Sequence, residues 1–108
     1  MSKLDEFIQE TGDTAKDLLK KEVKSLVEDM RSDSKDFLKE TGDLIEGWLI
    51  RRAKGELSNT ELERLIEARK YEAEQYLNTK DIQARARVER LADRLIDLIT
   101  NSAIDVIF

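Results

Sequence analysis

The sequence predicts an all-α protein, and three observations support that prediction. The 108-residue chain has no proline and only four glycines, so little in it breaks a helix. Aromatic residues, which favour strands, make up only 6% of the chain, whereas Ala, Leu, Glu, Lys and Arg are abundant. Apolar residues recur with a helical period in both halves, which argues against disorder despite 40% charged residues. We therefore expect a single helical domain spanning residues 1–108.

A stop-and-start signal near the middle of the chain divides this domain into two helical arms. Gly55 can adopt the positive φ of a helix C-terminus without steric cost. Ser58 and Glu61 have the spacing of a capping box, in which each side chain accepts a hydrogen bond from the other residue's amide. We predict a first arm over residues 3–54, a hinge at residues 55–60 and a second arm over residues 59–107. The hinge residues are Gly55, Ser58 and Glu61.

Each arm carries an apolar row that repeats every eleven residues. The rows consist of Leu4, Ala15, Leu26, Phe37 and Trp48 in the first arm and of Leu62, Ala73, Ala84, Leu95 and Val106 in the second. An eleven-residue repeat corresponds to about 3.67 residues per turn, close to that of a straight α-helix. We interpret the pattern as a long antiparallel helical hairpin. Its two arms of ~50 residues would each be roughly 70–80 Å long at about 1.5 Å per residue.

Four stretches weaken the arms, near residues 12–14, 32–34, 42 and 78–81. Ser, Thr, Asn and Asp in these stretches compete with the helix backbone for hydrogen bonds, so we expect kinks or short breaks. Closing the hairpin brings residues 32–34 beside residues 78–81. An imperfect repeat of residues 5–13 at 35–43 leaves an alternative open. In it, Gly12 and Gly42 each end a short helix, and the first arm becomes several helices in a more compact bundle.

Composition removes most of the residues from which enzyme active sites are built. The chain has no cysteine and no histidine, so it lacks thiol nucleophiles, the commonest general base and the commonest transition-metal ligand. Carboxylate pairs such as Glu63 with Glu67 have basic residues at i,i+3 or i,i+4, which favours a salt-bridged solvent face. Glycine-rich phosphate loops and a nucleophile elbow are also missing from the sequence. We expect a non-enzymatic protein that uses no cofactor and no metal.

The location predicted from the sequence is cytoplasmic. The N-terminal residues have no apolar signal-peptide core, no apolar run is long enough to span a membrane, and the absence of cysteine fits a reducing compartment.

One local excess of positive charge lies in the second arm. It consists of Arg85, Arg87, Arg90 and Arg94. Such a cluster can bind phosphates of nucleic acids or lipid headgroups. However, Glu89 and Asp93 interrupt it and the net charge is −5, so we do not favour nucleic acid as a partner. Eleven-residue amphipathic repeats also occur in helices that lie on lipid surfaces, and this alternative stays open, although the middle apolar stripe is thin.

Both ends of the predicted hairpin are apolar over a broad part of the helix circumference. A two-helix contact needs only a narrow seam, so broad faces indicate further neighbours. We therefore expect a structural or adaptor protein that associates with itself through helix–helix contacts. Trp48 is the expected main anchor because large aromatic residues dominate interface energetics. The other open alternative is a regulatory or phage-type accessory factor that binds a partner protein. The predicted interface residues are Phe7, Leu44, Trp48, Leu49, Ile104 and Phe108.

Overall fold

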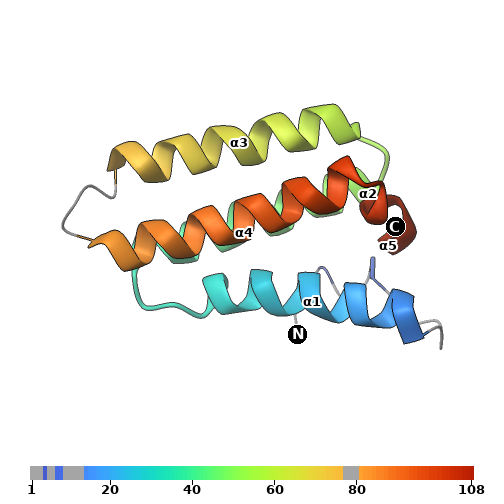
Figure 1. Ribbon diagram of the computed structural model, residues 1–108, viewed down its shortest axis with the longest axis horizontal. Helices are drawn as coiled ribbons and strands as arrows, with labels where there is room; N and C mark the ends of the chain where they lie inside the picture. Colours follow the sequence, from blue (N-terminus) through green and yellow to red (C-terminus); the bar gives the residue numbers. More distant parts are fainter. Residues whose placement is uncertain (1–3, 5–6, 9–13, 77–80) are drawn as a thin grey trace.

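Five helices occur in the part of the chain that the computed structural model describes, which is residues 4, 7, 8, 14–76 and 81–108. Four of them pack lengthwise as a bundle, and the fifth is short (Figure 1). The helices are α1 (Thr14–Arg31), α2 (Asp36–Ala53), α3 (Asn59–Tyr76), α4 (Ile82–Thr100) and α5 (Ala103–Ile107). The predicted all-α helical bundle is therefore confirmed.

The bundle differs from the predicted hairpin because each arm is folded in half. The first arm is the antiparallel pair α1 and α2, and the second is the antiparallel pair α3 and α4 (Figure 1). The Cα trace measures 43 × 27 × 22 Å with a radius of gyration of 13.5 Å. A globular chain of this length has a radius of gyration of about 13 Å. The prediction of two ~50-residue arms is therefore wrong, and the more compact bundle is the arrangement that forms.

The chain reverses between α1 and α2 at the weak stretch of residues 32–34. The Asp33 carboxylate accepts the backbone N–H of Lys35 at 2.8 Å, and the Asp33 N–H donates to the carbonyl of Met30 at 3.2 Å. An Asx-type bond of this kind offers the backbone an alternative to the helix ladder. The Lys35 ammonium lies 2.9 Å from the Asp81 carboxylate, which joins this turn to the start of α4. The turn and Asp81 thus lie at one end of the bundle, and residues 78–80 of the other weak stretch are outside the described residues.

Gly42 lies inside α2 and does not end a helix, so that part of the predicted broken arm is wrong. A Cβ atom at Gly42 would lie 2.6 Å from the backbone nitrogen of Arg31 and 2.7 Å from its Cγ. Because glycine has no Cβ, the last turn of α1 can approach the backbone of α2 at this point. Residues 12 and 13, the other expected break, are outside the described residues, and α1 begins directly after them at Thr14.

The predicted hinge chemistry is present between α2 and α3. Gly55 has a φ of 78°, the Ser58 N–H donates to Glu61 Oε1 at 3.0 Å, and the Glu61 N–H donates to Ser58 Oγ at 3.1 Å. In the long hairpin the hinge would lie at the opposite end from the C-terminus, whereas in the bundle both lie at the same end (Figure 1). The Asn59 side-chain amide donates to the Asp105 carboxylate at 3.1 Å, so the hinge contacts the C-terminal segment. We call this end of the bundle the hinge end and the opposite end, with residues 32–35, the turn end.

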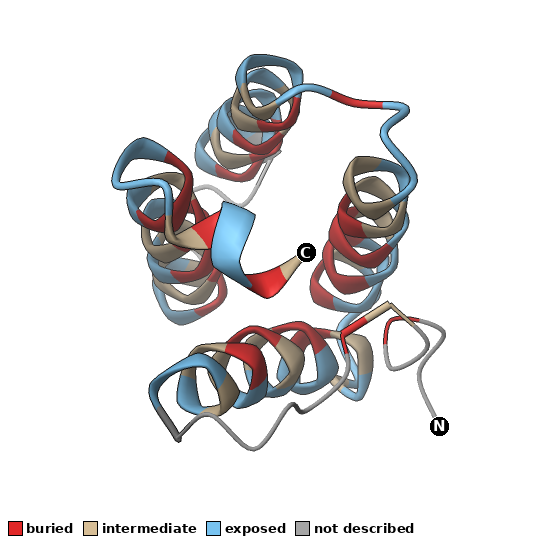
Figure 2. Cartoon of the chain, turned by 90° about the vertical axis from the view of Figure 1, so that its right-hand side faces the viewer, coloured by how far each residue is buried: buried red, intermediate tan, exposed pale blue. Residues whose placement is uncertain are grey.

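The core is built from aliphatic side chains, and α5 covers it at the hinge end. Figure 2 shows α5, which leads to the C-terminus, lying across the end of the bundle. Its Ile104 is 0% exposed and its Ile107 is 4% exposed. The eleven-residue row of the second arm contributes Leu62, Ala73, Ala84 and Leu95 to the core, whereas Val106 is exposed. Among the described residues, no helix combines the length and the apolar character that crossing a membrane requires.

Candidate functional site

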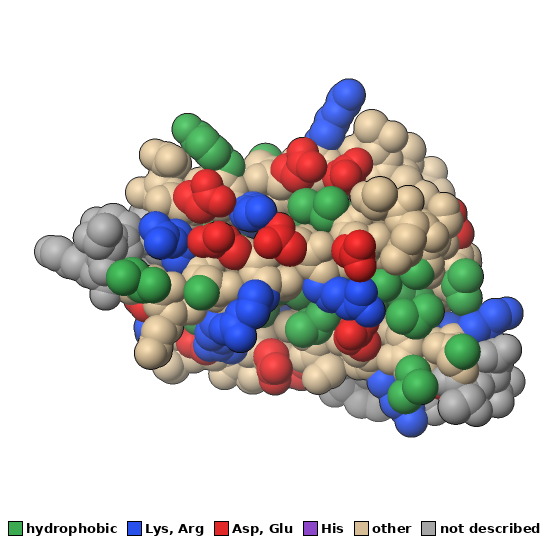
Figure 3. Space-filling model, in the orientation of Figure 1, with side chains coloured by type: hydrophobic (Ala, Val, Ile, Leu, Met, Phe, Trp, Pro, Cys, Tyr) green, Lys and Arg blue, Asp and Glu red, His purple; other side chains and the backbone are tan. Residues whose placement is uncertain are grey.

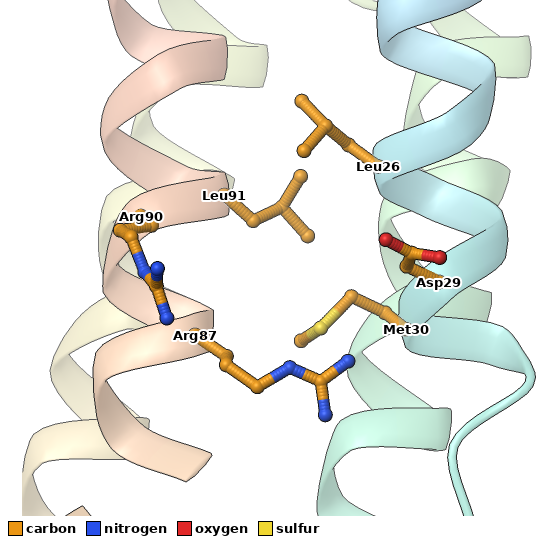
Figure 4. A pocket seen from close by; sticks show the side chains of 6 residues that line it. All are labelled: Leu26, Asp29, Met30, Arg87, Arg90 and Leu91. Carbon is orange, nitrogen blue, oxygen red and sulfur yellow. The ribbon is translucent and has the colours of Figure 1, made fainter. Parts of the chain in front are cut away.

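A hollow of about 230 Å³ lies in the seam between α1 and α4. We call this part of the surface the α1–α4 seam. Figure 4 shows Leu26 of α1 and Leu91 of α4 pointing toward each other across it, with the Met30 side chain below them. Met30 and Leu91 are almost completely buried, and Leu26 is half-buried. The floor of the hollow is therefore apolar.

Ion pairs close the seam on either side of the hollow. Toward the hinge end, Arg94 of α4 lies 2.8 Å from Glu22 of α1. Its hydrogen bond to Glu22 raises the pKa of the Arg94 guanidinium. Toward the turn end, Arg87 pairs with Asp33. The backbone N–H of Lys35 and then the Arg87 guanidinium lower the pKa of the Asp33 carboxyl.

The middle of the seam is left without such a pair. Asp29 on α1 and Arg90 on α4 both line the hollow and both are exposed (Figure 4). Within the described residues, no hydrogen bond or ion pair involves the Asp29 carboxylate. The guanidinium of Arg90 makes only a 3.5 Å bond from Nε to the Ala86 carbonyl there. The seam thus presents one acid and one base on opposite rims of an apolar floor.

The arginine cluster that the sequence singles out is mostly engaged with acids. Arg85 lies 3.3 Å from Glu89 on the same helix. Arg94 pairs with Glu22 of α1 across the seam, and Arg87 pairs with Asp33 in the turn that follows α1. Asp93, expected to interrupt the cluster, instead lies 2.6 Å from Lys70 of α3. A phosphate backbone would therefore have to compete with existing ion pairs for most of these arginines. Arg90 is the member of the cluster that is available.

The structure separates the six predicted interface residues into two groups. Leu49 and Ile104 are each 0% exposed and belong to the core of one chain. Phe7, Leu44, Trp48 and Phe108 are half-buried, so part of each side chain faces solvent. Phe7 lies beside the hinge, with the Lys54 ammonium 5.7 Å from its ring centroid, and Phe108 follows α5. None of the six lines the hollow of the α1–α4 seam.

A buried arginine, which sequence reasoning missed, connects α2 and α3 on another side of the bundle. Arg69 is 5% exposed, and its guanidinium carbon lies 3.9 Å from the centroid of the Phe37 ring. Its Nε donates to Thr41 Oγ1 at 2.9 Å, and its Nη1 donates to Glu72 at 2.9 Å. A shallow pocket of about 340 Å³ adjoins this cluster, lined by Phe37, Tyr71, Glu72 and Gln75. The half-buried Phe37 and exposed Tyr71 give this pocket aromatic walls.

These features define a small α-helical bundle with an open, oppositely charged seam. Within the described residues, no group of three or more Asp, Glu, His or Cys side chains could hold a metal ion. No protein-family model matches the chain, and searches of curated proteins and of solved structures give no significant match. The function must therefore be argued from the surface of the chain itself.

Proposed function

We propose that the chain is a non-enzymatic structural or adaptor protein that acts through helix–helix association, first of all with further copies of itself. The placement of the aromatic residues carries this proposal. The structure describes five aromatic side chains, and none of them is fully buried: Phe7, Phe37, Trp48 and Phe108 are half-buried, and Tyr71 is 63% exposed.

The aliphatic core explains why this placement points to association. Leu, Ile, Val, Ala and Met fill the interior, whereas Phe37, Trp48 and Phe108 pack against it from outside and each keeps part of its side chain exposed. Phenylalanine normally ranks among the most buried residues, and aromatic residues are enriched at protein interfaces. Three large aliphatic side chains are exposed as well, which are Leu18 at 63%, Ile82 at 56% and Val106 at 43%. Burying such side chains against another helix would be favourable.

Light scattering of the purified chain over a range of concentrations tests the proposal. We expect an assembly of two or more chains at micromolar concentration. A monomer of compact size throughout that range would contradict the proposal.

Replacing Trp48 by alanine tests whether this residue anchors the association. Truncation of a large aromatic anchor typically costs about 2 kcal/mol or more of binding, so we expect the dissociation constant to rise roughly thirtyfold. Tyr71→Ala is the matched control for the loss of an exposed ring away from the hinge end. Circular dichroism establishes that each variant is folded. An unchanged dissociation constant for Trp48→Ala would remove this residue from the interface.

A further inference from the structure

We propose that a second copy of the chain docks on the α1–α4 seam about a two-fold axis parallel to the helices. In this dimer, Asp29 of each chain pairs with Arg90 of the other. The inference rests on the self-association proposed above and adds to it a second contact surface, separate from Trp48 and the other predicted interface residues, none of which lines the hollow. It is carried by the distribution of charge across the seam.

The two rims of the seam have opposite sign. The α1 rim is acidic and contains Glu22, Asp29 and Asp33, whereas the α4 rim is basic and contains Arg87, Arg90 and Arg94. Figure 3 shows the side of the bundle that α3, α4 and α1 form, where acidic and basic side chains lie close together with hydrophobic side chains between them. The outer pairs of the seam are closed within the chain, so Asp29 and Arg90 are the charges left to meet a partner.

The sign of the rims selects one of two possible two-fold arrangements. An axis parallel to the seam places the α1 rim of one chain over the α4 rim of the other. Asp29 and Arg90 line the same hollow and so lie at a common height, which brings each opposite its complement in the second chain. An axis perpendicular to the seam would place acid over acid and base over base, which is unfavourable. Only the parallel axis makes the face self-complementary, as an isologous interface requires.

The face also has the size and apolar content that a dimer needs. Its two helices, α1 with 18 residues and α4 with 19, run along the longest axis of the bundle (Figure 1). Stable interfaces bury roughly 800 Å² per partner, which such a face can provide. Leu18, at 63% exposed, lies eleven residues before Asp29 and hence on nearly the same side of α1. The apolar stem of Arg90 can cover the hollow above Leu26 and Leu91 when its guanidinium reaches the second chain.

Charge reversal provides the test, because each chain carries both members of the pair. In Asp29→Arg, two arginines meet at both contacts, and in Arg90→Asp two aspartates meet. We expect either variant to raise the dissociation constant at least tenfold and to halve the mass of the assembly measured by light scattering. The double variant Asp29→Arg/Arg90→Asp restores both opposite-charge contacts and regains the wild-type mass. A mixture of the two single variants should likewise associate, because it forms complementary pairs.

Two exposed residues of α3 supply matched controls. Glu67→Arg and Arg64→Asp make the same changes in charge on a helix that α4 separates from α1 (Figure 1). We expect both to keep the wild-type mass. Thermal unfolding followed by circular dichroism shows whether each variant is folded, and the double variant keeps the test informative if one single variant is not.

The possible failures can be told apart. If the wild-type chain is a monomer, self-association itself is refuted. If the wild-type chain associates but Asp29→Arg behaves like Glu67→Arg, the seam is not the interface, while self-association stands on another surface. If each single variant associates like wild type but their mixture associates more tightly than wild type, like residues face each other, and the parallel axis is refuted.

Discussion

Helix α1 meets α2 and α4 in opposite ways. On the α2 side its last turn approaches the backbone at Gly42, where there is no room for a single methyl group. On the α4 side the two helices lie further apart, and a hollow of about 230 Å³ remains between two ion pairs. The first contact is defined by the absence of a side chain and the second by long charged side chains. One helix thus has a face that is closed by packing and a face that remains open.

The two contacts differ in what they contribute to folding and to binding. Close packing is sensitive to small changes of volume, because neighbouring atoms cannot move apart without losing dispersion contacts. Partly exposed ion pairs contribute at most about 1 kcal/mol each and tolerate rearrangement. We infer that the α1–α2 contact fixes the bundle, whereas the α1–α4 seam can adjust to a partner. Substitutions on the two faces should therefore have different effects.

Gly42→Ala should produce the largest effect, because it disrupts the close contact. The new Cβ would lie within 3.0 Å of both Arg31 and Met30 backbone atoms, so α1 and α2 must separate. Overpacking of this kind typically costs about 1–3 kcal/mol, and we expect a loss of free energy of unfolding near the top of that range. Chemical denaturation of the variant and the wild type measures the loss.

Gly47→Ala, in the same helix, is the matched control. A Cβ at Gly47 has no atom within 4 Å, and the residue is exposed. Replacing a helix-interior glycine by alanine should raise the stability by about 0.5–1 kcal/mol. Equal effects of the two substitutions would show that helix propensity, rather than the approach of α1, decides the role of Gly42.

Adding volume on the other face of α1 should have the opposite sign. Leu26→Phe places extra carbon atoms in the hollow between α1 and α4, and we expect it to stabilise the monomer by roughly 0.5–1 kcal/mol, as cavity-filling substitutions commonly do. The measurement is denaturation at a concentration where light scattering shows a monomer. A loss as large as that of Gly42→Ala would mean that the seam is as tightly packed as the α1–α2 contact.

The sequence was informative wherever structure depends on neighbouring residues. The all-α class, the positive φ of Gly55 and the Ser58–Glu61 capping box all rest on local chemistry, and all are present. The weak stretch at residues 32–34 was predicted as a kink or a short break, and the chain breaks and reverses there. Whether such a stretch bends or reverses depends on which helix its neighbours find to pack against. Helices α1 and α2 pack on each other, so the chain reverses.

The eleven-residue rows explain why the long arms were predicted. Within one helix, the residues of an eleven-residue row lie on the same face. Beyond a turn, the row continues to face the core only if the turn happens to contain a suitable number of residues. Ala73 of α3 and Ala84 of α4 are both buried, although the two helices are separate. In the first arm, by contrast, Leu26 and Trp48 of that row are only half-buried. Periodicity therefore identified apolar faces but not the number of helices.

The seam could not be predicted from sequence because its residues come together only in the tertiary fold. Asp29 and Arg90 are sixty-one positions apart, and no local pattern links them. Arg69 was missed for a related reason, since nothing near it in sequence indicates that a charged side chain is buried against Phe37. The arginine cluster was a usable signal: the structure adds which of its members already have acidic partners.

Acidification should give the smallest effect. It also acts on other carboxyls whose pKa values are lowered, so a comparison with Asp33→Asn is needed to isolate the seam. These carboxyls include Glu61, Asp81 and Asp105. The N–H of Lys35 and the guanidinium of Arg87 lower the pKa of Asp33 below its ordinary value of 3.8. A carboxyl whose pKa is lowered by folding stabilises the folded state above the unfolded pKa, and this contribution disappears as pH falls through the folded pKa. We expect wild type to melt at a higher temperature than Asp33→Asn at pH 7, with a gap that shrinks as pH falls below 3.8. Calorimetric melting between pH 7 and the acid range measures the gap.

Gly42→Ala is the reference for this pH series, because its defect is steric and involves no proton. Its difference from wild type should persist in acid, while the difference for Asp33→Asn closes. If both gaps stayed constant with pH, the ionised Asp33 would contribute nothing to the seam, and the contrast between a packed and an electrostatic face of α1 would fail at the turn end. If both closed together, α1 would be leaving α2 and α4 in one step, and its two contacts would form a single cooperative unit.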